Sequence, residues 1–360
     1  MTQAAQLAQY GANNVGLSFK NRIINGDMGI DQRNNGASGV TIDSYPVDRF
    51  RYQASQTSKL TWGQNLGSVT PPAGFNNYIG FSSSSAYSIT SSDYFVLTQI
   101  IEGNNCADLG FGTANAQPVT LSFWVRSSLT GTFSGSLMND NQLRSYVFTY
   151  TVNSANTWEQ KTITVPGDTT GTWLRNNGAG LLVRFSLGVG STWSTTPGSW
   201  VNGSFWSATG STSVVGTNGA TWQVTGVQLE KGTVATSFDY LPYSTELQLC
   251  QRYCYVSIGA NSLVAGAAQA SDNVYMKYVL PVPMRATPTI SFTASVGQPL
   301  TISDQYINDW GASSPSVTQA PTNGEISNRV RISGFSGLTT GRWYGGSPNT
   351  TGSMTYSAEL

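Results

Sequence analysis

The sequence predicts an all-β protein that consists of a jelly-roll β-sandwich followed by a smaller C-terminal β-domain. Short segments that alternate apolar and polar residues recur along the chain, and turns rich in Gly, Asn and Pro separate them. The aromatic residues that strands favour are abundant, with 17 Tyr and 10 Trp among 360 residues. Strand patterns do not alternate with helical ones, so we do not expect a parallel sheet with crossover helices.

The clearest strand pattern is VTLSFWVRS at residues 119–127. Apolar residues occupy its odd positions up to Val125, and the even positions are mostly polar, which is the period of a half-buried strand. Trp124 falls on the polar side, where a second layer or a neighbouring chain would bury it, or a ligand would stack on it. The segments at 160–168 and 181–188 repeat the theme. Together these patterns predict the sandwich over residues 20–243.

A change of pattern near residue 244 predicts a short linking helix over residues 244–255. Thr245 and Gln248 have the spacing of a capping box. The apolar stripe that follows at helical spacing consists of Leu247, Cys250 and Cys254. A single sandwich does not need this stripe, so we expect it to serve assembly between chains.

Strand patterns resume after the helix and predict a second β-domain over residues 256–360. They lie at residues 275–284, 287–295, 328–335 and 352–360. At the other end of the chain, residues 2–10 (TQAAQLAQY) are good helix formers with Leu7 and Tyr10 on one side. So short a helix is not stable alone. We therefore expect residues 1–19 to dock on another chain or another protein.

The charge balance excludes several classes of partner. The chain has 18 Lys and Arg against 18 Asp and Glu, and only 10% of its residues are charged. It offers no basic surface for nucleic acid or anionic lipid, and no stretch approaches the roughly 20 apolar residues of a membrane-spanning helix. Three cysteines make no disulfide framework, and without any His the pair Cys250 and Cys254 lacks further metal ligands.

Five ordered blocks carry a resemblance to a known family. They are KNRIINGDMGIDQRNNG with YPVDRF at residues 20–50, LTQIIEG at 97–103, VTLSFWVRS at 119–127, WEQKTITVPGDTTGTW at 158–173, and the segment from ATWQVTG to LCQRYC at 220–254. In this order they resemble the jelly-roll modules of bacteriophage tail-fibre and related virion proteins. The resemblance implies a homotrimeric fibre on the virion surface, with its N-terminal part attached to other virion proteins and its distal part facing the host. It also implies distant kinship with carbohydrate-binding jelly rolls.

Aromatic residues in loops are the candidates for ligand binding. Sugars are recognised by flat rings and by neutral polar partners, and exposed Trp, Tyr and Arg form interaction hot spots. In the sandwich the candidates are Trp193 and Trp200, and in the C-terminal domain they are Trp310, Arg342, Trp343 and Tyr344. The alternative is that these rings plug the ends of the two domains as part of the core.

Catalysis and metal binding are not expected. A glycosidase needs two carboxylates about 5–10 Å apart, and the sequence cannot pair its scattered acidic residues, which are Asp93, Glu102, Asp108, Asp140, Glu159 and Glu230. Such residues in a β-protein with little charge are typical of turns and of ion pairs with Arg. Asp27 and Glu230 suggest a structural Ca²⁺ ion by analogy with related modules, but two ligands are too few for Ca²⁺.

The sequence thus predicts a virion fibre subunit that binds a host-surface glycan or protein without cleaving it. A capsid- or tail-decorating protein such as a head fibre is the alternative, and a glycan depolymerase is the third hypothesis. We expect no cofactor, no nucleic acid and no membrane insertion.

Overall fold

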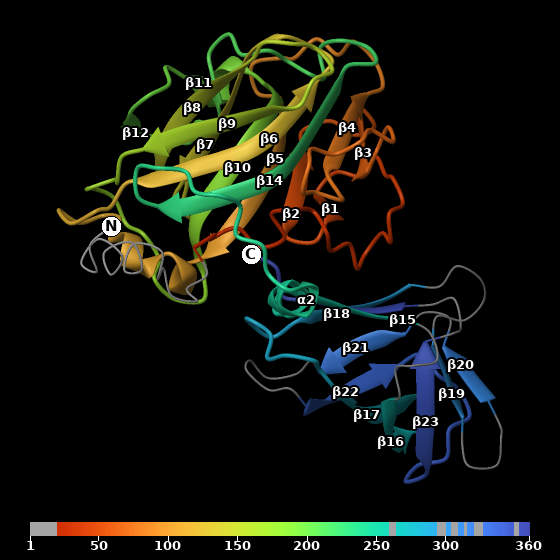
Figure 1. Cartoon of the computed structure of the whole chain (residues 1–360). Coiled ribbons are helices and arrows are strands. Elements are labelled where there is room, and N and C mark those ends of the chain that lie inside the picture. Colours follow the sequence, from red (N-terminus) through yellow and green to blue (C-terminus); the bar gives the residue numbers. More distant parts are fainter. Residues whose placement is uncertain are drawn as a thin grey trace, which may run out of the picture.

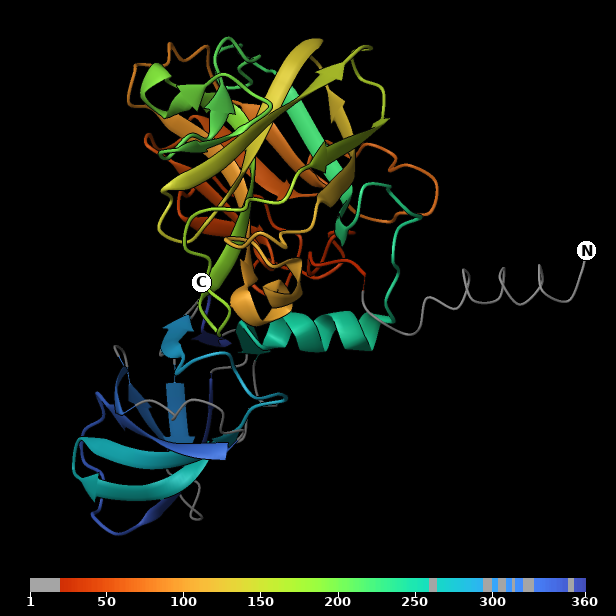
Figure 2. The ribbon, with the colours of Figure 1, turned by 90° about the vertical axis from the view of Figure 1, so that its left-hand side faces the viewer.

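The computed structural model describes residues 20–258, 264–293, 300–303, 309–312, 315–319, 327–348 and 353–360. Two β-bodies lie one above the other in Figure 1, and helix α2 (Tyr243–Gln251) lies between them in both views (Figures 1 and 2). The larger body is a β-sandwich and the smaller one follows α2. The expected all-β architecture is thereby confirmed. The predicted docking segment with Leu7 and Tyr10 lies outside the described residues.

Two antiparallel sheets form the sandwich. The seven-stranded sheet has the spatial order β1 (Ser44–Val47), β2 (Phe50–Ala54), β5 (Tyr94–Glu102), β10 (Ala179–Val189), β7 (Gly131–Met138), β8 (Arg144–Val152) and β12 (Trp200–Asn202). The five-stranded sheet has the order β3 (Leu60–Gln64), β4 (Ile79–Ser83), β14 (Thr221–Lys231), β6 (Val119–Ser127) and β9 (Glu159–Val165). Neighbours in space are often distant in sequence, as for β4, β14 and β6.

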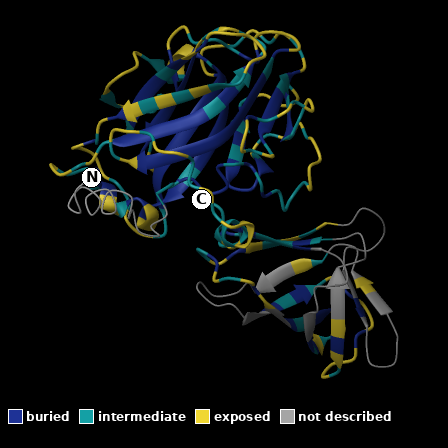
Figure 3. Ribbon diagram, in the orientation of Figure 1, coloured by how far each residue is buried: buried dark blue, intermediate teal, exposed yellow. Residues whose placement is uncertain are grey.

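The core of the sandwich follows from strand alternation. In β6 the side chains of Val119, Leu121, Phe123 and Val125 are fully buried, as the sequence pattern predicts. Trp124, on the opposite face, is half-buried and lies beside Gly226 of β14. The buried strands appear dark blue in Figure 3.

Strand β10 is covered on both of its faces. Its odd-numbered residues, such as Phe185 and Leu187, enter the sandwich core. Its even-numbered residues, Leu182, Arg184 and Ser186, are also buried. The chain after β10 covers them. That chain contains a 3-10 turn η3 (Ser191–Trp193) and a two-stranded parallel sheet of β11 (Ser194–Thr195) and β13 (Ser207–Ala208).

Helix α2 forms where the sequence predicts a helix, but it begins and ends differently. Its N-cap is Pro242, with no side-chain hydrogen bond, so the predicted capping box of Thr245 and Gln248 is wrong. The helix ends at Gln251, and Cys254 already belongs to strand β15 (Cys254–Ile258). In the part of the chain that the structure describes, no helix is long and apolar enough to cross a membrane.

The C-terminal body contains two further sheets. The three-stranded sheet has the order β15, β24 (Ser353–Ser357) and β18 (Thr289–Thr293). The other has the order β20 (Asp309–Ala312), β19 (Leu300–Ser303), β23 (Trp343–Pro348), β16 (Val264–Ala270), β17 (Asn273–Val279), β22 (Ser327–Ser333) and β21 (Ser316–Gln319). Its core includes Met276, Val330, Ile332 and Met354.

Candidate functional site

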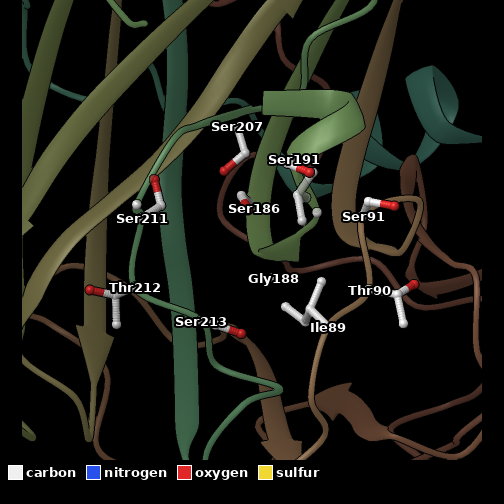
Figure 4. Close-up of a pocket in the computed structure, with 13 residues that line it drawn as sticks. Ile89, Thr90, Ser91, Ser186, Gly188, Ser191, Ser207, Ser211, Thr212 and Ser213 are labelled. Atoms are coloured by element: carbon white, nitrogen blue, oxygen red, sulfur yellow. The ribbon is translucent and has the colours of Figure 1, made fainter. Parts of the chain in front are cut away.

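A pocket of about 360 Å³ opens at one end of the sandwich (Figure 4). One side is the loop Ile89–Ser91 before β5, and the base consists of the end of β10 and the two residues that follow it, up to Ser191. Residues 203–213, which we call the flap, supply the other side through Ser207 and residues 210–213. Figure 4 shows Ser211, Thr212 and Ser213 on the side opposite Ile89 and Thr90. The volume falls in the range of small-molecule sites.

Hydroxyl groups dominate the lining of this pocket. They belong to Thr90, Ser91, Ser186, Ser191, Ser207, Ser211, Thr212 and Ser213, and the remaining lining residues are Gly, Ile and Val. No charged side chain and no aromatic ring is among them. The pocket is therefore suited to a neutral ligand that offers many hydrogen-bonding groups.

Ser186 is the distinctive residue of the lining. It is 1% exposed, and its hydroxyl has no hydrogen-bond partner among the residues that the structure describes. A buried hydroxyl without a hydrogen-bond partner lowers the stability of the folded protein, and native proteins rarely contain such a group. Close by, Gly188 keeps the base open, because a Cβ atom there would lie within 2.8 Å of Val215, Ile89 and Ser213.

Asp93 holds the loop side of the pocket in place. Its carboxylate accepts hydrogen bonds from the Thr90 backbone N–H (2.8 Å), the Thr90 hydroxyl (2.7 Å), the Ser55 hydroxyl (2.7 Å) and the Tyr87 hydroxyl (2.9 Å). Burial alone would raise the pKa of Asp93, but these hydrogen bonds outweigh burial and lower it below its ordinary value. Asp93 is thus an ionised support for the loop, and it is not a member of the pocket lining.

Ser134 of β7 anchors the flap on the opposite side. Its hydroxyl lies 2.8 Å from the Ser207 hydroxyl, accepts the Ser211 hydroxyl at 2.7 Å, and accepts the Ala208 N–H at 3.0 Å. These three contacts hold the flap against β7. The two sides of the pocket are therefore both fixed by hydrogen bonds within the chain.

Two tryptophans stack beside the pocket. The rings of Trp193 and Trp206 lie 5.0 Å apart at 21°, and the Trp193 indole donates to the Ser92 carbonyl at 3.0 Å. In the sequence Trp206 is next to Ser207, and Trp193 is two residues from Ser191. Both serines line the pocket. Neither ring is among the residues that line the pocket, so the sequence-predicted Trp193 adjoins a lining segment without lining the pocket itself.

Arg184 lies beneath Trp206 on the covered face of β10. Its guanidinium is 4.3 Å from the Trp206 ring and donates to the Thr98 hydroxyl at 3.3 Å. Among the described residues, no carboxylate forms an ion pair with it. Burial lowers the pKa of Arg184 to about 9. Trp206 therefore covers a desolvated cation, and its ring partly compensates that charge.

The other sandwich candidate, Trp200, lies in a separate aromatic cluster. Its ring packs against Phe111, Tyr146 and Trp173 at 5.4–5.8 Å, and its indole donates to the Pro166 carbonyl at 2.6 Å. Trp200 does not line the pocket. Its contacts match the packing alternative, in which such rings close one end of the sandwich.

The C-terminal candidates do not form one exposed group. Trp343 is 69% exposed, whereas Tyr344 is buried in the C-terminal core, and its hydroxyl accepts the Thr339 N–H at 2.9 Å. The expectation of an exposed Tyr344 is wrong because alternate residues of β23 face opposite sides. Arg342 is half-buried. Trp310 lies in β20, paired with Ile302, and its side chain is outside the described part.

The proposed assembly stripe is covered within the chain. Cys250 and Cys254 are fully buried, and Cys250 packs with Ile24, Ile30 and the half-buried Leu247. The expectation that these cysteines meet a neighbouring chain is therefore wrong. The first domain itself supplies the apolar partners, through a segment more than 200 residues away in sequence.

The acidic residues have structural partners in most cases. Glu102 binds Arg252, Asp108 binds Arg22, Glu159 binds Lys161, and Glu230 accepts the N–H and hydroxyl of Thr236. Asp140 is exposed in a turn. Asp27 accepts the Gly29 N–H, separately from Glu230. Among described residues, no three His, Cys, Asp or Glu side chains gather as a metal site.

Sequence reasoning missed the hydroxyl-lined pocket, although a signal was present. In the strand segment LLVRFSLG, Arg184 and Ser186 occupy alternate positions, which predicts a polar, exposed face. The structure instead covers that face with the flap. A serine-rich segment after a strand of this kind is the sequence feature that points to such a pocket.

No family model and no curated protein matches this sequence. Among solved structures, the enzymatically active domain of tailspike protein 4 of bacteriophage CBA120 is 12% identical, with a TM-score of 0.34, over 60% of this chain and 22% of that chain. A family 11 carbohydrate-binding module from Clostridium thermocellum, in complex with a mixed-linked tetrasaccharide, is 11% identical, with a TM-score of 0.29, over 55% of this chain and 98% of the module.

A protein from Bacteroides thetaiotaomicron described as sugar-binding is 13% identical, with a TM-score of 0.35, over 59% of this chain and 99% of that protein. Overlaps of this quality transfer no function. The sandwich assignment depends on the strand order of this chain itself.

Proposed function

We propose that this chain binds a glycan in the pocket between residues 89–91, the end of β10 and the flap, as a non-catalytic subunit of a bacteriophage fibre. The observation that carries the binding proposal is the hydroxyl-rich, uncharged lining, with Ser186 buried at the base and without a partner. A ligand hydroxyl that reached Ser186 would supply the missing hydrogen bond.

The lining favours sugars over other small molecules. Sugars carry several hydroxyls that both donate and accept, and serine and threonine hydroxyls can meet them in either direction. A charged ligand would find no counter-charge in the lining, and a flat apolar ligand would find no ring. A neutral ligand with many hydroxyls therefore fits both the hydroxyl groups of the lining and its lack of charges and rings.

Binding at one such pocket is expected to be weak. Without a ring in the lining, the ligand gains hydrogen bonds, each worth only about 0.5–1.5 kcal/mol. Several linked copies overcome this weakness, since avidity exceeds single-site affinity by roughly 10²–10⁴. A homotrimeric fibre on a virion, which the five sequence blocks suggest, would supply these copies.

The first test removes the unpartnered hydroxyl. Ser186→Ala should weaken binding of the best ligand on an array of neutral oligosaccharides by about 0.5–1.5 kcal/mol, measured by titration calorimetry. Because the hydroxyl has no partner in the described part of the chain, its removal breaks no hydrogen bond seen there. The free energy of unfolding should therefore stay unchanged or rise by about 1 kcal/mol.

Ser136 provides the matched control. It is also fully buried on a strand of the same sheet, its hydroxyl also lacks a partner, and it does not line the pocket. Like Ser186→Ala, Ser136→Ala should leave the free energy of unfolding unchanged or raise it by about 1 kcal/mol, but it should leave binding unchanged. Equal binding by wild type and Ser186→Ala, or a complete lack of binding to neutral oligosaccharides, would contradict the glycan proposal.

The fibre role is tested separately. Sedimentation of the full chain should give a trimer, and the purified trimer should bind host cells and compete with phage attachment. A stable monomer would rule out the trimeric fibre. A trimer that joins particles but neither binds cells nor competes would favour the head-fibre alternative. New reducing ends from host polysaccharide would identify a depolymerase.

A further inference from the structure

A second pocket lies beside the first and shares a side with it. It has a volume of about 550 Å³ and is lined by Ser128, Leu129, Thr130, Ala155, Thr212, Ser213, Gly216 and Thr217. Thr212 and Ser213 belong to both linings. We call these two residues the ridge. On one side of the ridge is the pocket of Figure 4, and on the other are the turn after β6 and the turn after β8.

The ridge is a fixed part of the fold. The Thr212 N–H donates to the Thr132 carbonyl at 2.7 Å, and the N–H groups of Val214 and Val215 both donate to the Leu187 carbonyl, at 2.9 and 3.1 Å. Both valines are fully buried in the sandwich core. The ridge therefore stands between two pockets whose spacing is set by the core.

The second pocket has the same chemistry as the first. Five of its eight lining residues carry hydroxyls, including the two of the ridge, and the other three are Leu129, Ala155 and Gly216. Again no charged residue and no aromatic ring takes part. A ligand that suits one pocket thus suits the other, and each volume falls within the range of small-molecule sites.

We infer that the two pockets form one binding groove, and that its ligand is a neutral oligosaccharide long enough to cross the ridge. This inference rests on the proposed glycan binding and specifies its ligand class. A monosaccharide would occupy one pocket only, whereas an oligosaccharide of three or more sugar units would contact both sides of the ridge. Affinity should therefore increase with chain length until both pockets are filled.

The test compares chain lengths on wild type and on a variant with the second pocket filled. An array of neutral and uronic-acid-containing oligosaccharides of one to six units identifies the best series, and calorimetry then measures its members. Thr217→Met should fill the second pocket, because methionine is long and apolar and cannot offer a flat ring to a sugar. This variant should weaken the affinity for the longer oligosaccharides by about tenfold. Its affinity for the monosaccharide should equal that of the wild type.

Two further variants make the result decisive. Ala155→Met fills the second pocket from its other side and should have the same effect, whereas Asn218→Met changes an exposed neighbour outside the lining and should have none. Equal affinity for one and six units, unaffected by either filling variant, would overturn the groove and leave the first pocket as a sugar site. Preference for uronic-acid chains would overturn the neutral class. No binding on the whole array would overturn the proposed function itself.

Discussion

Individual residues carry the most information on the covered face of β10. Ser186 and Arg184 lie two positions apart there, and both are buried, but their costs differ. A neutral hydroxyl without a partner costs little and is easily satisfied by a ligand, whereas a desolvated cation without a carboxylate costs much more. The ring of Trp206 compensates Arg184 in part. Of these two residues, only Ser186 is thus proposed to bind a ligand.

Glu246 of α2 is expected to make stability depend on pH. Burial raises the pKa of Glu246 to about 7 from 4.5, and the nearby carboxylates Asp27 and Asp239 add to the rise, although the Asn25 N–H donates to Glu246 and opposes it. The folded chain thus holds this proton more tightly than the unfolded chain. The resulting stabilisation is complete below about pH 4.5 and is lost as the pH rises towards 7.

Glu246→Gln should remove this dependence, because an amide does not titrate and its oxygen still accepts from Asn25. Urea unfolding should show the variant close to wild type at pH 4 and more stable by about 1–3 kcal/mol at pH 8. Asp48, whose pKa is raised to about 6 mainly by burial, titrates in the same window in both proteins and cancels in the comparison. Asp140→Asn, at an exposed turn, is the control and should give no such divergence. A constant difference at all pH values would contradict the role of Glu246.

At the scale of elements, strands were predictable where apolar and polar residues alternate between the two faces. The segment 119–127 alternates because β6 has an apolar core face and a polar face that is only partly buried, and the structure gives it the bounds Val119–Ser127. Alternation failed for β10, since the flap covers the face that its polar residues occupy. The alternation within a strand does not show whether a later segment of the chain buries its polar face.

The helix illustrates the same limit. The spacing of the apolar residues predicted that a helix forms, but not where it begins. Its N-cap is Pro242, three residues before Thr245, the first residue of the predicted capping box. The partner of its apolar stripe was also unpredictable. Ile24 and Ile30 cover it from the far end of the sequence, and a contact of such sequence separation leaves no local signal.

For the whole molecule, the junction between the two bodies is polar and largely buried. The carboxylate of Glu359 pairs with Arg33 and Arg49, so the last described residues return to the first domain. The guanidinium of Arg285 donates to the Asn177 carbonyl at 2.7 Å and to the Ala358 carbonyl at 2.9 Å. Such directional contacts fix the orientation of one body on the other.

Glu102, at the end of β5, is the central acceptor of this junction. It is 1% exposed and accepts two hydrogen bonds from Arg252, at 3.0 and 2.7 Å, and one from the Tyr253 hydroxyl at 2.8 Å. Burial opposes its ionisation, but these bonds together outweigh burial and lower the pKa of Glu102. Residues of the sandwich and of the segment after α2 thus share one charge pair, in which the carboxylate is buried and Arg252 is partly exposed.

Glu102→Gln should therefore destabilise the molecule far more than the loss of a surface ion pair. Gln can accept only one of the two Arg252 hydrogen bonds and removes the opposite charge, but Arg252 is 34% exposed, so urea unfolding at pH 7 should show a loss of about 1–3 kcal/mol. Asp108→Asn is the matched control, because the Arg22–Asp108 pair is exposed and should be worth less than about 1 kcal/mol. Limited proteolysis should also cut the Glu102→Gln variant faster around α2. Equal stability of the two variants would mean that the junction contributes no more than a surface contact and that the two bodies are held together by the apolar contacts of α2 alone.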